Sequence, residues 1–165
     1  MDIIKSTRHQ KIIGDFGESL LCNFLSRSGF EVTIVDHTGI DIVAYNPKTR
    51  QRFGITVKSR TRLKGTESTT VNIFSYRNGK NDRQKVLAAC EAFACEPWIA
   101  IYVESSDSAD LFLLSLSHYS NEYRGKENKA IDTWKMSKKY KLRYYNDPAV
   151  KHVRIDLSWK SWEWI

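Results

Sequence analysis

Glu18, Asp41 and Lys58 are the residues of this sequence whose types and order could do chemistry together. Two carboxylates beside a lysine suit the metal-assisted hydrolysis of a phosphodiester. The carboxylates hold a divalent cation, and the cation lowers the pKa of a bound water. The lysine orients the nucleophile or neutralises the charge that develops in the reaction.

A hairpin would bring Asp41 and Lys58 close together. Residues 40–45 and 52–58 are predicted strands because they are rich in β-branched and apolar residues. Residues 46–51 begin with Asn-Pro-Lys, which is a turn signal, and are expected to join the two strands. Both residues lie far from this turn, one on each strand, so antiparallel pairing sets them near each other.

The side chains around this pair are expected to alternate between the two faces of the sheet. Ile40 and Ile42 flank Asp41 and should face the opposite side from it. Thr56 and Lys58 should share one face of their strand.

Glu18 lies in a helix that is predicted over residues 14–28. Apolar residues recur there at three- and four-residue spacing, with Phe16 among them, and Gly29 is placed for the left-handed residue after a helix. If this helix packs across the sheet, Glu18 reaches the same place as Asp41.

A run of basic residues leads out of this region. Lys58, Arg60, Arg62 and Lys64 occupy alternate positions, so in an extended segment all four side chains point the same way. Beside a phosphodiester site, such a run forms a track for DNA phosphates, and Arg60, Arg62 and Lys64 are its DNA-binding candidates. The alternative is a solvated strand edge whose charges prevent pairing with another chain.

The other apolar runs predict a mixed sheet and a second helix. The run at 98–104 is apolar throughout and is expected in the centre of the sheet. The second helix is expected over 81–94, with Pro97 beyond its end. The remaining strands are expected at 30–35, 69–76, 111–116 and 153–157.

We therefore expect one α/β (α+β) domain over residues 1–165. The core should span about 14–116, and residues 117–165 should form a basic, aromatic extension. From residue 124 to 143 this extension holds eight Lys and Arg residues against two acids, interleaved with Tyr and Trp, a mixture that suits a nucleic-acid surface. A flexible polar flap is the alternative. The DNA-binding candidates there are Lys135, Lys138 and Lys139.

The last residues are also aromatic. Trp159, Trp162 and Trp164 end the chain and are expected in core or dimer packing rather than as platforms for base stacking.

The overall charge agrees with an anionic partner. The chain has 165 residues, with 26 Lys and Arg against 19 Asp and Glu, a net charge of +7. Nucleic acid is the commonest partner of such a basic domain. At 41% hydrophobic residues the chain can form a core, which excludes disordered and fibrous classes.

Other classes are excluded by what the sequence lacks. No apolar run approaches the roughly 20 residues that span a bilayer, and the first residues do not have the plan of a signal peptide. Three cysteines without a CxxC pair and four isolated histidines argue against a disulfide framework or a zinc site. We expect a cytoplasmic protein that does not bind membranes.

These motifs resemble the PD-(D/E)XK nuclease superfamily, and within it the archaeal Holliday-junction resolvases and related small endonucleases. The resemblance spans about residues 14–116 and keeps the family's order. The matching stretches are Gly17-Glu18-Ser19-Leu20, Gly29-Phe30-Glu31-Val32, Gly39-Ile40-Asp41-Ile42-Val43-Ala44, Ile55-Thr56-Val57-Lys58-Ser59, Gln84-Lys85-Val86-Leu87 and Glu96-Pro97-Trp98-Ile99-Ala100.

The resemblance implies a restriction-endonuclease-like fold and DNA cleavage that depends on Mg²⁺ or Mn²⁺. Asp41 would be the metal-binding aspartate, Glu18 the helix acid that binds the metal directly or through water, and Lys58 the catalytic lysine. The main-chain carbonyl of Val57 would be a further metal ligand. A homodimer is expected, because cutting two strands with one site per chain calls for a second copy.

Thr56 departs from the family pattern. The family has Glu, Asp or sometimes Gln at this position, two residues before the lysine, and a threonine hydroxyl is a poor ligand for a hard cation. Glu31, Asp36 or Glu67 could substitute for the missing acid. Otherwise the site works weakly, or the protein is a DNA-binding module that no longer cleaves. A third alternative is a basic structural protein without a nucleic-acid role.

Overall fold

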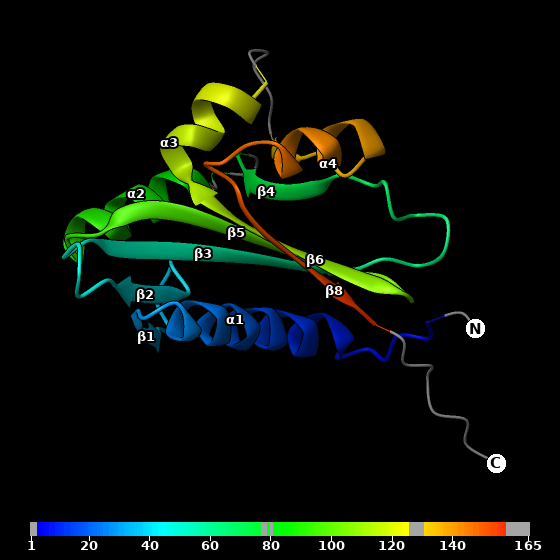
Figure 1. Ribbon diagram of the computed structural model, residues 1–165, viewed down its shortest axis with the longest axis horizontal. Helices are drawn as coiled ribbons and strands as arrows, with labels where there is room; N and C mark the ends of the chain where they lie inside the picture. The colour runs from blue at the N-terminus through cyan, green and yellow to red at the C-terminus, as the bar shows by residue number, and fades with distance from the viewer. Residues whose placement is uncertain (1–2, 77–78, 80, 126–130, 158–165) are drawn as a thin grey trace.

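A computed structural model of the chain shows a six-stranded sheet between two layers (Figure 1). It describes residues 3–76, 79, 81–125 and 131–157. The helices are α1 (His9–Arg27), α2 (Asp82–Ala92), α3 (Leu116–His118) and α4 (Lys138–Tyr145), and a π-helical turn, η1 (Tyr119–Tyr123), follows α3. The strands are β1 (Glu31–Ile34), β2 (Ile42–Tyr45), β3 (Arg52–Thr61), β4 (Val71–Ser75), β5 (Glu96–Glu104), β6 (Ser108–Ser115), β7 (Ile131–Trp134) and β8 (Lys151–Asp156).

The main sheet has the order β1-β2-β3-β5-β6-β8, and β4 pairs with β7 in a second, two-stranded sheet. In the main sheet only β3 and β5 are parallel; the other neighbouring strands are antiparallel. The predicted α/β class with a mixed sheet is therefore confirmed. The apolar strand β5 lies in the interior of the sheet, as predicted.

Helix α1 covers one face of the sheet (Figure 1). Ile13, Gly17, Leu21 and Leu25 follow one another at four-residue spacing and form its buried stripe. The helix begins five residues before the predicted start and ends one residue before the predicted end, with Gly29 at a φ of 85°. Phe16, which the periodicity placed inside, is 48% exposed.

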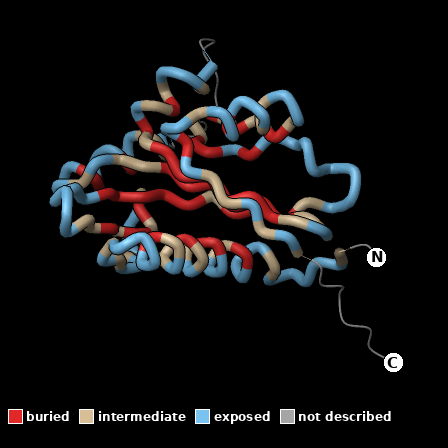
Figure 2. Tube along the Cα trace, in the orientation of Figure 1, coloured by how far each residue is buried: buried red, intermediate tan, exposed pale blue. Residues whose placement is uncertain are grey.

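The opposite face carries α2 and the layer that contains β4, β7 and α4 (Figure 1). The buried residues run along the central strands, between the two layers (Figure 2). Side chains of β5 alternate between the faces: Ala100 and Tyr102 pack with α1, whereas Ile99 and Ile101 pack with α2. One sheet thus separates two hydrophobic clusters.

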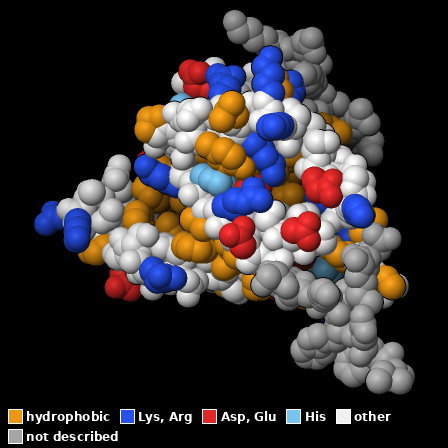
Figure 3. All heavy atoms as spheres, turned by 45° about the vertical axis from the view of Figure 1, so that its right-hand side comes forward, with side chains coloured by type: hydrophobic (Ala, Val, Ile, Leu, Met, Phe, Trp, Pro, Cys, Tyr) orange, Lys and Arg blue, Asp and Glu red, His pale blue; other side chains and the backbone are white. Residues whose placement is uncertain are grey.

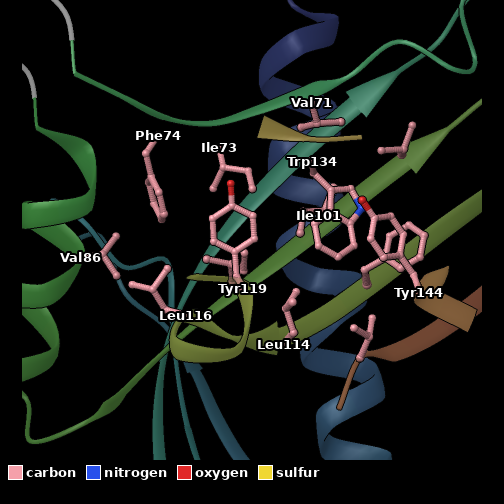
Figure 4. Close-up of a cluster of buried hydrophobic side chains, with 14 of the residues drawn as sticks. Val71, Ile73, Phe74, Val86, Ile101, Leu114, Leu116, Tyr119, Trp134 and Tyr144 are labelled. Carbon is pink, nitrogen blue, oxygen red and sulfur yellow. The ribbon is translucent and has the colours of Figure 1, made fainter. Parts of the chain in front are cut away.

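Residues beyond 116 contribute to this core. The indole of Trp134 stacks on the ring of Tyr144, with 3.8 Å between the ring centroids, and both are fully buried (Figure 4). Strand β8 completes the main sheet beside β6. The core therefore extends past the predicted boundary at 116. The three C-terminal tryptophans lie outside the described residues, and the prediction of a single domain stays a prediction.

The bounds of every predicted strand differ from the prediction by a few residues, and β3 and β5 are both longer than predicted. β3 continues past Lys58 to Thr61, because it pairs with β5 along its whole length. β5 begins at Glu96 and so includes Pro97, which was expected only to end the preceding helix. Proline is tolerated at the beginning of a strand, where few ladder hydrogen bonds are lost. Among the residues that the structure describes, no helix has the length and apolarity to cross a bilayer.

A buried carboxylate ties β6 to α4 and β8. Asp110, 3% exposed, accepts hydrogen bonds from Lys141 Nζ at 2.6 Å, and its other oxygen lies 2.9 Å from His152 Nε2. Burial by itself would raise the pKa of Asp110, but the bonds from Lys141 and His152 lower it below the ordinary 3.8.

This lowered pKa predicts a loss of stability in acid. The stabilisation is fully present above the ordinary pKa of an aspartate and is lost as the pH falls through the lower folded-state value. We expect Asp110→Asn to cost about 1.5–3 kcal/mol at pH 7 and to flatten the fall of the unfolding free energy below pH 4. Urea unfolding at several pH values measures both effects. An unchanged pH slope would contradict the role of Asp110.

Candidate active site

Asp41 lies where β2 and β3 separate. The pairing of the two strands begins at Ile42 and Ile55, and the main-chain N–H of Asp41 donates to the carbonyl of Ile55 at 2.8 Å. Beyond this point β2 no longer pairs with β3. The next main-chain N–H of β3 on this side, that of Val57, donates instead to Asp41 Oδ2 at 2.6 Å. The carboxylate therefore lies in the plane of the sheet and continues the ladder by one bond.

The flanking residues show the same irregularity. Ile40 packs in the cluster on the α2 side, whereas Ile42 packs in the cluster on the α1 side. The prediction that both face away from Asp41 on one side is therefore wrong. The reason is that regular β2 starts only at Ile42, so Asp41 precedes the pleated alternation.

One edge of β3 is open beside Asp41. From Val57 to Thr61, β3 pairs with β5 on one side and, within the described residues, with no strand on the other. The N–H and C=O of one strand residue face the same neighbour. The carbonyl of Val57 therefore faces the open edge, on the side where its N–H meets Asp41.

Gly17 lets α1 approach this edge closely. A Cβ at Gly17 would collide with the hydroxyl of Ser59 on β3. The next residue, Glu18, is half-buried. Burial is the main cause that raises the pKa of the Glu18 carboxyl; the charge of Asp41 raises it further, and that of Lys58 opposes the rise. The charges of Asp41 and Lys58 thus both act on the Glu18 carboxyl.

Thr56 lies against the same carboxylate. Its side chain is only 3% exposed, and its hydroxyl donates to Asp41 Oδ2 at 3.2 Å. Lys58 follows two residues later on the same face of β3 and is half-buried. The position where the resemblance expects a carboxylate therefore holds a hydroxyl that supports Asp41.

None of the suggested substitute acids completes a metal cluster. In the part of the chain that the structure describes, no three His, Cys, Asp or Glu side chains gather into a group that could hold a metal ion. Glu31 pairs with Tyr45, at the end of β2 away from Asp41, and Glu67 accepts from the N–H of Gly65 in its own loop. Asp36 is exposed beyond the end of β1.

The candidate metal ligands that remain are all oxygen atoms. They are the carboxylates of Asp41 and Glu18 and the main-chain carbonyl of Val57. Mg²⁺ is often held by one or two carboxylates, with waters and substrate phosphates as the other ligands. The donor set therefore fits Mg²⁺, with one negative charge fewer than a three-acid site.

The basic run on β3 divides at the end of the strand. Lys58 and Arg60 are half-buried on β3, whereas Lys64 lies exposed in the following loop, beyond the alternation. Arg62 donates to the carbonyls of Thr69 and Thr70 and thereby holds the loop closed. Burial lowers the pKa of its guanidinium, and the positive charge of Arg60 adds to this effect.

Much of the basic charge in the C-terminal tract is paired within the fold. Lys135 Nζ donates to the hydroxyl of Tyr140 and lies 4.6 Å from the centroid of its ring. Lys138 and Lys139 are exposed in the first turn of α4, a helix end that disfavours positive charge. In the view of Figure 3 the Lys and Arg side chains are most concentrated in the upper half of the molecule. The ion pairs are Arg124 with Asp132, Lys141 with Asp110, and Arg143 with Glu122.

Sequence reasoning missed Lys5 and His9, which lie beside the open edge of β3. Lys5 Nζ donates to the carbonyl of Thr61 at 2.6 Å, and His9 Nε2 lies 2.7 Å from its hydroxyl. Both residues precede the predicted start of the first helix, so no periodic pattern drew attention to them. The only signal was their basic character.

Comparisons with known proteins support the fold. No protein-family model matches the sequence, and no curated protein matches it significantly. Among solved structures the chain is similar to Hjc, a Holliday junction resolvase from the archaeal hyperthermophile Archaeoglobus fulgidus. The TM-score is 0.53 at 16% sequence identity, over 78% of this chain and 88% of the resolvase. The chain therefore has the restriction-endonuclease-like fold that was expected, and shares it with this resolvase.

Proposed function

We propose that this protein is a Mg²⁺-dependent endonuclease that hydrolyses phosphodiester bonds in DNA. The observation that carries the proposal is the arrangement at the open edge of β3. There the carboxylate of Asp41 meets the main chain of Val57, and Glu18 and Lys58 lie within electrostatic reach. The resolvase-like fold supports the same chemistry.

In this proposal Asp41, Glu18 and the carbonyl of Val57 hold the cation. A bound Mg²⁺ would supply a water of lowered pKa for in-line attack on the phosphorus and would stabilise the charge on its oxygens. Lys58 orients the attacking water and neutralises developing charge at the phosphate. The Thr56 hydroxyl, by donating to Asp41, fixes the carboxylate in position.

Basic residues that are exposed or half-buried would hold the DNA backbone. Arg60 continues the open edge of β3, and Lys138 and Lys139 place two charges at the start of α4 without a local partner among the described residues. Such contacts position the duplex without reading its sequence. Arg62 and Lys135 are engaged within the fold, so we assign them a smaller part than Lys64, which is exposed.

The substrate of this proposal is branched DNA or a specific duplex site. Each chain offers one candidate site, whereas the cutting of both strands requires two. We therefore infer a homodimer, in which each copy cuts one strand.

The second candidate is a DNA-binding module that has lost cleavage. The favouring observation is that Thr56 places a neutral hydroxyl where the nuclease pattern has a carboxylate, and no other described acid replaces it. This candidate keeps the basic surface and the fold but lacks turnover.

Incubation of the purified protein with a four-way junction and with plasmid DNA separates the two candidates. With Mg²⁺ or Mn²⁺ we expect cleavage that EDTA abolishes and that Lys58→Ala reduces to background. Binding that weakens steeply with salt, without cleavage in either metal, would leave the binding module. If cleavage by Lys58→Ala equals that of the wild type, the activity does not belong to this site.

A further inference from the structure

A cavity continues the open edge of β3 beyond the candidate active site. It has a volume of about 200 Å³ and lies between the start of α1 and the end of β3. Lys5, His9, Ser59 and Arg60 are among the residues that line it. The described part of the chain places no acidic side chain in its lining.

The cations of this cavity are held at the edge of the strand by its own main chain. Lys5 Nζ donates to the carbonyl of Thr61, and the guanidinium of Arg60 donates to the carbonyl of Ser59 at 2.7 Å. Ser59 and Thr61 face the open edge because main-chain groups alternate along a strand, and Val57 already faces it. Their N–H groups therefore lie on the same side as the two cations and can donate to an anion.

The beginning of α1 adds to the positive potential. This helix has no side-chain cap and no acid in its first turn, so its positive dipole end is not compensated there. The hydroxyl of Ser59, a residue 6% exposed, has no hydrogen-bond partner within the described residues. Ser59 lies in the wall of this basic cavity, and its hydroxyl is buried against Gly17 of α1.

One acid lies behind the cavity. Glu104 Oε1 is 4.0 Å from His9 Nε2, but Glu104 is buried and accepts the hydroxyls of Thr61 and Tyr102. The Glu104 carboxylate therefore lies behind His9, inside the fold, whereas Lys5 and Arg60 meet solvent at the edge of the strand.

We propose that this cavity binds a phosphate group of the DNA backbone next to the site of cleavage. The proposal rests on the proposed function, since it takes the ligand from the same DNA strand. Strand residues rise by roughly 3.3 Å, so Thr61 lies roughly 10 Å along the edge from Lys58. One phosphate of a DNA strand can then lie at Asp41 while another phosphate, a short way along the same DNA strand, lies in the cavity. Binding here fixes which bond is presented for hydrolysis.

The alternative is that Lys5 and Arg60 only blunt the exposed edge of β3, which means that their charges keep it from pairing with another chain. The variants Lys5→Gln and Arg60→Gln separate the two roles. Lys48→Gln is the control, because Lys48 is exposed in the turn between β2 and β3 and its loss changes the net charge equally. DNA binding is measured in EDTA over a series of salt concentrations, so that cleavage does not enter the result.

We expect Lys5→Gln and Arg60→Gln each to weaken DNA binding about tenfold at low salt, as for the loss of one charged hydrogen bond. Each should lower the slope of log affinity against log salt by about 0.9, whereas Lys48→Gln should leave the slope unchanged. Inorganic phosphate should shift the amide resonances of Ser59 and Thr61 in the wild type and not in Lys5→Gln.

Slopes that equal those of the wild type, or a Lys5→Gln variant that only unfolds earlier or self-associates, would overturn the proposal and leave the edge-blunting role. The outcome is independent of the nuclease assay. Altered slopes in a protein that never cleaves would keep the phosphate site and remove the nuclease. Normal slopes in a protein that cleaves would remove only the phosphate site.

Discussion

Replacing Asp41 by Asn is expected to reduce DNA cleavage by about a thousandfold or more while the fold stays intact. The amide oxygen of Asn can still accept from the N–H of Val57 and the hydroxyl of Thr56, so the ladder bond is kept. The negative charge is lost, and with it one of the two carboxylates that are available for the cation. We expect an unfolding free energy within about 1 kcal/mol of that of the wild type.

Asp41→Ala is the matched comparison. It removes the charge and also leaves the N–H of Val57 without its acceptor, so a stability loss of about 1–3 kcal/mol should accompany the loss of cleavage. Single-turnover cleavage with Mg²⁺ and urea unfolding measure the two effects separately. If Asp41→Asn cleaves at the wild-type rate, Asp41 serves only the ladder and is not a metal ligand.

The hairpin at Asp41 shows what the sequence could predict. β-branched runs on either side of an Asn-Pro turn determine both strands and their antiparallel pairing, and these place Asp41 opposite the segment with Thr56 and Lys58. Periodicity likewise predicts α1, because its buried stripe repeats every four residues. These are local patterns, and local patterns can be read from a sequence.

The finer geometry depends on contacts between distant residues. No pattern indicates that the Asp41 carboxylate lies in the plane of the sheet, since this follows from where β2 stops pairing with β3. The charges of the C-terminal tract are similar: Lys141 appears as a free surface residue in the sequence but reaches Asp110, 31 positions away. Pairing of this kind removes apparent DNA-binding charge, and only the fold shows it.

The early start of α1 has the same origin. His9 and Ile13 belong to the helix because Ile13 packs on the sheet and His9 meets Thr61, neither of which a window starting at Gly14 includes. The cavity beside the candidate site depends on these residues. Sequence patterns therefore predict the helix and the hairpin that carry the two acids and the lysine, but not the neighbouring surface for which we propose phosphate binding.

Thr56→Glu is expected to destabilise the protein by about 3–5 kcal/mol in EDTA and to recover most of that loss in Mg²⁺. Thr56 is 3% exposed and touches Asp41, so a glutamate there adds a buried carboxylate beside an existing one. It also removes the hydroxyl that donates to Asp41. A divalent cation bound among three carboxylates offsets this repulsion, and binding to the folded state raises its stability.

Thr56→Gln is the control for size. It has nearly the shape of glutamate but no charge, so Mg²⁺ should raise its stability no more than it raises that of the wild type. Thermal unfolding with and without 10 mM Mg²⁺, a concentration on the order of 100 times a dissociation constant of 0.1 mM, would show a gain of about 2.7 kcal/mol for Thr56→Glu. Equal Mg²⁺ responses of the two variants would show that position 56 does not face a cation.

The cleavage activity of Thr56→Glu then decides what the native threonine means. If cleavage appears only in this variant, the wild-type protein is a nuclease fold that holds DNA without cutting it, and one missing carboxylate accounts for the loss. If the wild type cleaves and Thr56→Glu cleaves less, the two-carboxylate site is the working one. In that case the Thr56 hydroxyl is a positioning group for Asp41, because a third charge beside that carboxylate disturbs the geometry that the hydroxyl maintains.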